Sequence, residues 1–360
     1  MKTMLQIGFS ILSLLLFLSC ETGHTPTTPD NSSNWHYKVV DNGEVSLSPV
    51  SLCLDGAGHA HIAYSKYPQY FGPFIYLAHF NGDQWSFEEM AGNDAWQGMY
   101  TLVAGPSLRI DAMDVLHLAF FRSFTHFITE HEMHYLNNEG GVWNSMQFDP
   151  DAGGVGNSLC LALDAQNNPH ISYSITNPPS IRIADYNGSS WTISTITIIN
   201  ALYRTSLAID AQGNKHLIYS NSNTHALVYA KCVGSVWTFE NISSCGGYCS
   251  IVLDSNGHPR ISNDNNGMEY IEWDGSNWLK TKLDSSGRFS SIAIDSSDNP
   301  HISYDNSGLN YAYYNGQTWE ITTLDSAAAA TSIALNNAGK PRIAYVVEDT
   351  KNLKYAWYEE

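Results

Sequence analysis

One unit of about 47 residues repeats seven times between residues 35 and 360, and this repeat constrains the fold more than any single motif does. Its clearest copy reads SIAID at 291–295, NPHISY at 299–304, LNYA at 309–312 and NGQTW at 315–319. The first segment returns at 52–55, 108–111, 161–164, 207–210, 251–254 and 333–336. Repeats of this length are typical of architectures in which each unit is stable only against its neighbours.

Each unit contains four short apolar or alternating runs separated by turn residues, which predicts four antiparallel strands. Asp-x-x-Gly or Asp-x-x-Asn follows the first strand, and Asn-Gly or Asp-Gly turns often precede the fourth, as tight hairpins require. A tryptophan marks the fourth strand in every copy. Four such strands make one propeller blade. The predicted fold class is therefore all-β, a seven-bladed β-propeller of four-stranded antiparallel blades.

The repeat is out of phase by one strand at the two ends of the chain. The last unit stops after its third strand, near Tyr358, whereas WHYKVV at 35–40 begins with a tryptophan and has no unit of its own. We expect this N-terminal strand to complete the seventh blade and to close the ring.

The first twenty residues indicate export. Lys2 precedes an apolar run at 5–18 that is too short to span a bilayer, and Cys20 follows it. This segment resembles a bacterial lipoprotein signal; an ordinary secretory signal is the alternative. The resemblance implies lipidation at Cys20, a membrane contact through the lipid anchor only, and a location in the bacterial cell envelope, at the outer membrane or cell surface. The predicted domains are a signal peptide at 1–19, a flexible Pro- and Thr-rich tether at 20–34 and the propeller at 35–360.

The charge balance excludes one class of partner. The chain has 35 acidic against 17 basic residues, a net charge of −18, and such a surface is a poor match for nucleic acid. We expect a monomer. Among the cysteines, Cys53 and Cys160 lie in predicted inner strands and are interpreted as buried thiols. Cys245 and Cys249 are close enough in sequence to form a small disulfide, with Cys232 as a competing partner.

Loop lengths indicate which face of the ring carries the function. In a propeller, the connections from the second to the third strand and from the fourth strand to the next blade share one face, here called the loop face. The remaining turns form the opposite turn face. The long connections, at 65–74, 89–106, 122–132 and 149–157, all belong to the loop face of blades one to three. We therefore expect a binding site on the loop face, over blades one to four.

Residues that recur in equivalent positions are explained by the blade, and residues that depart from the repeat are candidates for function. The second strand carries a histidine in five units, which predicts a structural hydrogen-bonding role; catalysis or metal binding by one of them is the alternative. These residues are His61, His117, His170, His216 and His301, with Arg260 and Arg342 in the other two units.

The second residue of the third strand varies freely around the ring and includes His134 and Arg182. In the same region, HFITEHEMH at 126–134 gathers three histidines and two carboxylates. His131 and His134 are candidate ligands of a divalent metal ion, and the sequence leaves the cofactor otherwise unknown. The alternatives are a solvated loop and a glycan-binding or acid–base role.

Cationic and aromatic residues gather in the predicted loop face of this otherwise acidic chain. Aromatic faces beside cationic hydrogen-bond donors suit sugars, above all sugars that carry carboxylate or sulfate. The expected partner is therefore a carbohydrate, in particular an acidic polysaccharide. The candidate substrate-binding residues are Arg122, His126, Tyr70, Trp96 and Tyr100, and Lys66 and Arg204 add positive charge to the same face.

Two resemblances to known families bear on function. The turns at 274–278 and 315–319 look like shortened Asp-box turns of sialidase-type propellers, but they lack one residue of that box, and the Arg-Ile-Pro segment of sialidases is absent. His134, Tyr173 and Arg182 occupy positions similar to the catalytic set of seven-bladed propeller lyases that cleave ulvan. This resemblance implies a histidine base, a tyrosine acid and an arginine that neutralises the uronate carboxylate. The chain is shorter than those lyases and shows no diagnostic motif.

Three functions remain open from the sequence: a non-enzymatic carbohydrate-binding protein, an enzyme, and a protein-interaction scaffold. An enzyme would be a polysaccharide lyase acting by β-elimination or a glycosidase. The latter would require two carboxylates that face each other across the site.

Overall fold

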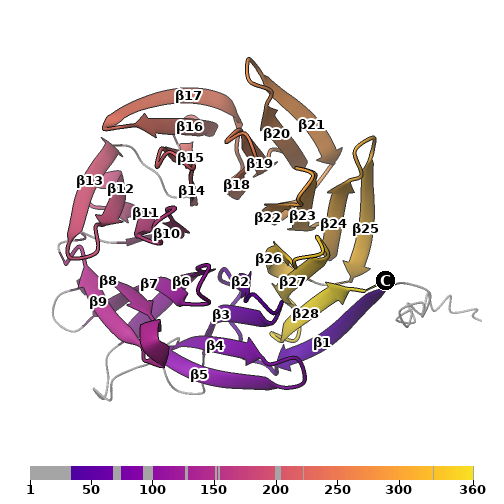
Figure 1. The fold of residues 1–360 in the computed structure, drawn as a ribbon, viewed down its shortest axis with the longest axis horizontal. Helices are drawn as coiled ribbons and strands as arrows, with labels where there is room; N and C mark the ends of the chain where they lie inside the picture. Colours follow the sequence, from indigo (N-terminus) through magenta and orange to yellow (C-terminus); the bar gives the residue numbers. More distant parts are fainter. Residues whose placement is uncertain are drawn as a thin grey trace, which may run out of the picture. The chain divides into compact units, whose positions relative to one another are not determined.

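Seven four-stranded antiparallel sheets surround a common axis in the computed structural model, and each sheet is one blade (Figure 1). The structure describes residues 34–67, 74–91, 100–125, 129–150, 152, 155–198, 204–221, 223–326 and 328–359. The predicted seven-bladed propeller is confirmed. In six blades the first strand in sequence lies nearest the axis and the fourth lies at the rim, and in the seventh blade the N-terminal strand of the chain takes the rim position.

The first four blades follow the repeat in chain order. Blade 1 consists of β2 (Ser51–Leu54), β3 (Ala60–Lys66), β4 (Phe74–Phe80) and β5 (Trp85–Ala91). Blade 2 consists of β6 (Tyr100–Ile110), β7 (Leu116–Thr125), β8 (Thr129–Asn137) and β9 (Asn144–Phe148), with the 3-10 turn η1 (Glu139–Gly141) before β9. Blade 3 consists of β10 (Val155–Leu163), β11 (Pro169–Thr176), β12 (Pro179–Tyr186) and β13 (Trp191–Ile198). Blade 4 consists of β14 (Thr205–Ile209), β15 (Lys215–Asn221), β16 (Ala226–Val233) and β17 (Val236–Ser244).

The remaining blades include the one that combines both ends of the ring. Blade 5 consists of β18 (Cys249–Leu253), β19 (Pro259–Asp264), β20 (Met268–Trp273) and β21 (Trp278–Asp284). Blade 6 consists of β22 (Arg288–Ile294), β23 (Pro300–Asp305), β24 (Leu309–Tyr314) and β25 (Trp319–Asp325). Blade 7 consists of β26 (Ala329–Leu335), β27 (Pro341–Val346), β28 (Leu353–Tyr358) and β1 (Trp35–Asp41).

The ring closes through the N-terminal strand, as predicted. Strand β1 pairs antiparallel with β28, with Trp35 opposite Tyr358 and Val39 opposite Lys354. Because β1 is the outer strand of a blade whose other three strands come from the C-terminus, the two ends of the propeller sequence lie side by side (Figure 1). This pairing covers the strand edge that β28 would otherwise expose.

The hydrophobic core is divided among the junctions between blades. Each of the seven buried clusters combines side chains from two neighbouring blades. At the junction of blades 6 and 7, for example, Leu309 packs in one cluster with Ile343 and Ala356. Each blade is therefore stabilised by burial against both neighbours rather than within its own sheet.

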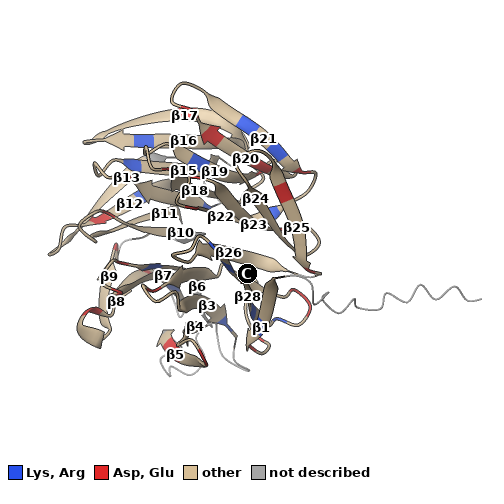
Figure 2. Cartoon of the chain, turned by 45° about the vertical axis from the view of Figure 1, so that its right-hand side comes forward, with Lys and Arg blue, Asp and Glu red and all other residues tan. Residues whose placement is uncertain are grey.

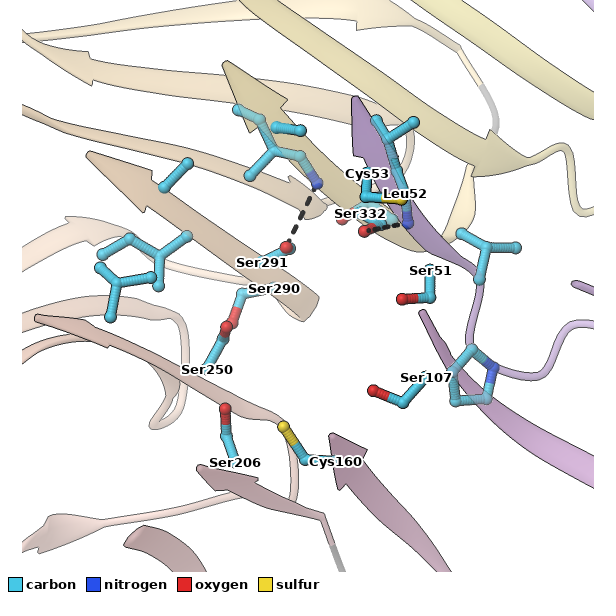
Figure 3. A pocket seen from close by; sticks show the side chains of 18 of the residues that line it. Ser51, Leu52, Cys53, Ser107, Cys160, Ser206, Ser250, Ser290, Ser291 and Ser332 are labelled. Carbon is cyan, nitrogen blue, oxygen red and sulfur yellow. Dashed lines mark hydrogen bonds between the residues drawn. The ribbon is translucent and has the colours of Figure 1, made fainter. Parts of the chain in front are cut away.

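Around the axis, one small polar side chain of the inner strand links neighbouring blades at six of the seven junctions (Figure 3). Ser51, for example, accepts a hydrogen bond from the backbone N–H of Leu108 in the next blade at 2.9 Å. The same bond is present at six junctions, and the acceptors are Ser51, Ser107, Cys160, Ser206, Ser291 and Ser332. The repeated serine is therefore a ring-closing residue.

The loop face differs in part from the expectation. The segment 122–132, predicted as a long connection, mostly extends the hairpin of β7 and β8, and β6 already begins at Tyr100. The extension pairs Arg122 with Glu132 in register. A longer antiparallel hairpin pairs more backbone N–H and C=O groups. Aromatic and β-branched residues such as those of this segment favour the extended conformation that such pairing needs. The centres of the other long connections lie outside the described residues.

The five described cysteines carry free thiols. Cys245 and Cys249 share a buried cluster, whereas the thiol of Cys232 donates to the carbonyl of Gly234. The first pair is therefore the one that the fold brings together. No helix within the described part of the chain is long and apolar enough to cross a membrane.

Candidate functional site

Tyr173 and Arg182 meet on the loop face, where both contact Asp149. The Tyr173 hydroxyl donates to Asp149 Oδ2 at 2.5 Å, and Arg182 Nη1 donates to the same oxygen at 2.7 Å. Tyr173 is fully buried, and burial together with the Asp149 charge raises the pKa of its hydroxyl well above the ordinary value. The arginine that the lyase resemblance assigns to a substrate carboxylate is therefore engaged by a carboxylate of the protein.

This arrangement belongs to the repeat. In three other blades, the tyrosine near the end of the second strand also donates to an aspartate that ends the outer strand of the preceding blade. These pairs are Tyr64 with Asp41, Tyr304 with Asp284, and Tyr345 with Asp325. Lys66 and Lys354 add a cation to Asp41 and Asp325, as Arg182 does to Asp149. The geometry thus gives Tyr173 and Arg182 a structural contact, and their catalytic role stays a prediction.

His134 has different partners. Its ring stacks on Phe120 at a centroid distance of 5.3 Å, and its Nε2 lies 2.8 Å from Glu132 Oε2. His131 is three residues away on the regular strand β8, so the two imidazoles project from opposite faces of the blade. The strand therefore does not bring these candidate metal ligands together. Among the described residues, no group of three or more His, Cys, Asp or Glu side chains could hold a metal ion.

Several other predicted residues cannot be placed. His126, Tyr70, Trp96 and the lipidation residue Cys20 lie outside the described residues. Tyr100 begins β6, but its side chain is not described. Their assignments stay predictions.

The histidines of the second strand are structural, as predicted. His216 places Nε2 at 3.3 Å from Asp210 and Nδ1 at 2.7 Å from the Tyr229 hydroxyl. Equivalent Asp–His–Tyr contacts recur in blades 2 and 6, through His117 with Tyr135 and His301 with Tyr311. Each aspartate also accepts backbone N–H groups of the turn that follows the inner strand; Asp210 does so from Gln212 and Asn214.

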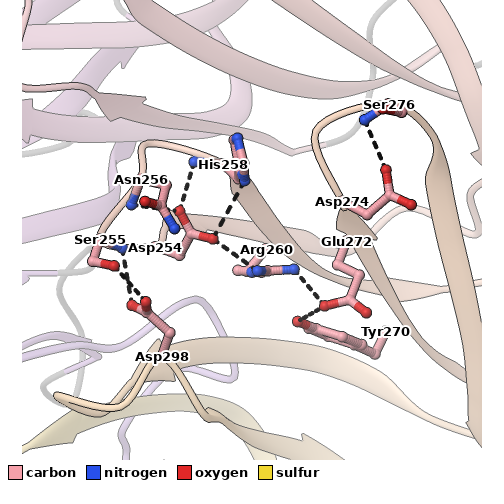
Figure 4. A network of polar contacts seen from close by, with 10 residues as sticks. All are labelled: Asp254, Ser255, Asn256, His258, Arg260, Tyr270, Glu272, Asp274, Ser276 and Asp298. Carbon is pink, nitrogen blue, oxygen red and sulfur yellow. Dashed lines mark hydrogen bonds and ion pairs between the residues drawn. The ribbon is translucent and has the colours of Figure 1, made fainter.

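Departures from this triad are compensated within the same blade. In blades 1 and 3 the tyrosine is absent, and His79 and Asp185, each on the third strand, contact the histidine instead. In blade 5, Arg260 replaces the histidine and bridges Asp254 and Glu272, which also accepts from Tyr270 (Figure 4). These contacts fix the turn after the inner strand to the second and third strands of the same blade. The residues that make them are therefore explained by the structure of the blade.

The tryptophans of the fourth strands pack in a recurring way at the junctions between blades. In five junctions the tryptophan of the fourth strand packs edge to face against the third-strand tyrosine of the preceding blade, at centroid distances of 4.9 to 5.5 Å. The pairs are Trp35 with Tyr311, Trp85 with Tyr355, Trp191 with Tyr135, Trp278 with Tyr229, and Trp319 with Tyr270.

The groove between blades 4 and 5 opens into a cavity of about 420 Å³ on the turn face. Its aromatic wall is formed by Trp278 and Trp273, whose rings lie 5.3 Å apart and are both partly exposed. Its opposite wall carries Lys231 on β16 and Glu240 on β17. Glu240 Oε2 accepts a hydrogen bond from Trp278 Nε1 at 3.1 Å.

Lys231 and Glu240 depart from the repeat. The positions equivalent to Lys231 hold His79, Asn137, Asp185, Glu272, Tyr313 and Trp357. Glu240 has one counterpart, Glu88, which accepts from Trp143 Nε1 at 3.0 Å. Within the described part of the chain, no carboxylate lies within ion-pair distance of the Lys231 ammonium. The groove therefore combines two indole rings, an accessible cation and an exposed carboxylate, and the blade itself requires only the indoles.

Charged residues of both signs also lie near each other on the outer strands of blades 5 and 6. Figure 2 shows two basic positions on β21 beside acidic positions on β20 and β25. The groove between blades 4 and 5 is thus distinguished by its combination of rings and charges, rather than by a field of one sign.

Comparison with known proteins identifies the fold but no family. No family model matches the chain, and no curated protein matches it. A solved structure of an Aleuria aurantia lectin mutant in complex with Fucα1-6GlcNAc is similar over 79% of this chain and 98% of that chain, with 13% identity and a TM-score of 0.54. A Dyadobacter fermentans protein of unknown function matches over 90% and 99%, with 10% identity and a TM-score of 0.57. A Trypanosoma rangeli sialidase in complex with sialic acid matches over 88% of this chain and 54% of that chain, with 10% identity and a TM-score of 0.50. At these identities the likeness shows the fold alone.

Proposed function

We propose that this protein binds carbohydrate without cleaving it, and that the groove between blades 4 and 5 is a saccharide site. The observation that carries this proposal is the convergence of Trp278, Trp273, Lys231 and Glu240 on one cavity. The two indoles supply an apolar surface. At its edge, the Lys231 ammonium supplies hydrogen-bond donors and the Glu240 carboxylate supplies acceptors.

This combination matches the chemistry of a neutral pyranose. A sugar ring presents an apolar face of C–H groups, which packs against an indole, and a rim of hydroxyls that both donate and accept hydrogen bonds. Hydrogen bonds to charged groups are stronger than neutral ones, so Lys231 and Glu240 are suited to hold such hydroxyls. A cavity of this size accommodates one or two sugar rings. The lectin complex with a fucose-containing disaccharide supports the same ligand class for a related ring fold.

The groove favours binding over hydrolysis. Hydrolysis of a glycosidic bond would require two carboxyl groups on opposite sides of the bond. Glu240 is held by the Trp278 indole, and Asp210, at the edge of the groove, is occupied by its own turn and by His216. This arrangement suits a saccharide held in its ground state.

A ligand-observed saturation-transfer NMR screen tests the proposal with a panel of neutral methyl glycosides that includes methyl α-L-fucoside. We expect transfer to at least one glycoside, with a dissociation constant on the order of 1 mM for a single ring. Lys231→Ala should remove that transfer at unchanged thermal stability. Absence of transfer from every glycoside, or unchanged transfer in the variant, would contradict the proposal.

Two finer features extend this proposal from the sequence. We propose that the protein is an envelope lipoprotein held by an acyl chain on Cys20, and that its loop face recognises an acidic polysaccharide. The first is tested by Cys20→Ala, which should move the protein from the membrane to the soluble fraction, because no amphipathic segment would replace the lipid anchor. A variant that stays with the membrane would refute the anchor.

A further inference from the structure

Four side chains form a continuous stack at the loop-face end of the central channel, across blades 4, 5 and 6. The Arg204 guanidinium lies 4.7 Å from the centre of the Tyr248 ring. The Tyr248 ring lies 4.3 Å from that of Phe289, and the Arg288 guanidinium lies 5.5 Å from Phe289. Arg204 also borders the channel cavity of about 500 Å³. Two cations thus flank two aromatic rings at the mouth of a cavity.

The repeat does not account for this stack. Arg204, Tyr248 and Phe289 each stand two residues before the serine of an inner strand, at Ser206, Ser250 and Ser291. The other blades hold smaller residues at that position, namely Pro49, Gly105, Ser158 and Ala330. Small side chains are therefore sufficient for the blade at this position. The large side chains in three consecutive blades serve some other purpose.

The backbone of Phe289 makes an aromatic side chain costly in blade 6. Phe289 has φ of +54°, and its equivalents Gly105 and Ala330 have +68° and +55°. The shared value arises from a bulge where the inner strand pairs with the second strand. Glycine adopts this conformation freely, whereas a bulky residue in it costs on the order of 1–3 kcal/mol. Such strain is typical of residues kept for a binding or catalytic role.

Arg204 also differs from two other arginines near the loop face, Arg182 and Arg288. Arg182 pairs with Asp149, and Arg288 pairs with Asp305 at 2.8 Å. Among the described residues, no carboxylate lies within ion-pair distance of the Arg204 guanidinium, which is partly buried against the two rings. The nearby Asp264 carboxylate is turned to the backbone, where its Oδ1 accepts from Tyr248 N at 3.0 Å.

We propose that the channel mouth is a second ligand site, which takes the carboxylate or sulfate group of an acidic sugar on Arg204 and packs the sugar ring on Tyr248 and Phe289. A planar guanidinium binds an oxyanion with two parallel hydrogen bonds, and stacking on an aromatic ring holds its plane in place. The channel wall below adds hydroxyls, from Ser206 and Ser250. This site specifies where the acidic glycan proposed for the loop face would bind, and it is separate from the neutral-sugar groove on the turn face.

Two uronate probes and one neutral probe test the site. Isothermal titration calorimetry compares oligogalacturonate, methyl glucuronoside and methyl glucoside. The titrations are made at about 150 mM salt, because the Debye length of about 8 Å then screens the net negative charge of the protein. We expect both uronates to bind at least tenfold more tightly than methyl glucoside. Arg204→Met should weaken uronate binding at least tenfold, while Lys280→Met, which removes an exposed cation on the rim strand β21, should change it less than twofold.

Further variants separate this site from the groove and from misfolding. Tyr248→Leu should weaken uronate binding through loss of the ring, and both mouth variants should keep the melting temperature within a few degrees. Lys231→Ala should leave uronate binding unchanged. The proposal would be overturned by equal affinity for uronate and glucoside, or by uronate binding to Arg204→Met at the parent affinity. Loss of uronate binding in Lys231→Ala would also overturn it and would place the anionic sugar in the groove.

Discussion

Leu207 donates its backbone N–H to the Sγ of Cys160 in the preceding blade, at a donor–acceptor distance of 3.4 Å. At five other junctions a serine hydroxyl accepts the same bond at 2.9 to 3.2 Å. Cys160 is therefore a substitute for the ring-closing serine, and its buried thiol serves as a hydrogen-bond acceptor for the ring.

The first prediction concerns this acceptor. Cys160→Ser should keep or raise the stability of the ring, because a hydroxyl accepts the Leu207 N–H more strongly than a thiol does. Cys160→Ala should lower the free energy of unfolding by about 1–3 kcal/mol, since it leaves a buried N–H without a partner. Urea unfolding of both variants is the measurement. Equal losses for serine and alanine would show that packing, rather than this bond, decides.

The second prediction concerns ring closure. Removing residues 35–40 deletes most of β1 and should lower the free energy of unfolding by at least about 3 kcal/mol. Loss of the Trp35 side chain, which is 9% exposed at the junction with blade 6, would by itself account for about this amount. A protein that lacks only residues 20–33 is the matched control and should melt like the parent. Identical melting of the two truncated proteins would mean that the ring closes in another way.

Much of the fold was predictable because it repeats. The offset of Trp35 predicted the closing strand, and the recurrence of His216 and its equivalents predicted their structural role. The sequence could not distinguish a structural role of Tyr173 and Arg182 from a catalytic one. Their shared partner, Asp149, lies in a connection whose geometry depends on the packing of the blades.

The groove between blades 4 and 5 was missed for a different physical reason. The short turns of the turn face directed the prediction to the loop face, yet the groove is built from strand positions. Lys231 and Glu240 come from blade 4 and Trp278 from blade 5, so their proximity depends on packing between blades. The available signal was the departure of Lys231 and Glu240 from the repeat, whereas the prediction rested on departures at the second residue of the third strand.

A third prediction follows from the buried His301. Burial lowers the pKa of its imidazole from 6.5 to about 4, so the folded protein binds fewer protons than the unfolded chain between these values. The stability it contributes is complete above pH 6.5 and is lost as pH falls through about 4. His301→Gln should flatten the decline of the unfolding free energy in this window by up to about 3 kcal/mol, measured by denaturant titration at several pH values. An unchanged slope would contradict the shift.

The fourth prediction tests the lyase resemblance. A lyase would generate unsaturated sugar ends that absorb in the near ultraviolet from a uronate polysaccharide, and His134→Ala would abolish this signal. Because Asp149 already engages Tyr173 and Arg182, we expect no absorbance change. We also expect Tyr173→Phe to lower the free energy of unfolding by about 1–3 kcal/mol, like the matched Tyr345→Phe. Turnover that His134→Ala removes would establish the enzyme and refute this expectation.

Calorimetric titration of the preferred neutral glycoside into two matched variants tests the central claim most directly. Glu240→Gln and Glu88→Gln each keep an oxygen that accepts from the facing tryptophan, Trp278 or Trp143, and each removes one negative charge from an equivalent strand position. If the groove between blades 4 and 5 holds the sugar, Glu240→Gln should weaken binding about fivefold, because a charged hydrogen bond exceeds a neutral one by about 1 kcal/mol. Glu88→Gln should bind like the parent protein. Equal affinities of the two variants would contradict the assignment of the saccharide to this groove.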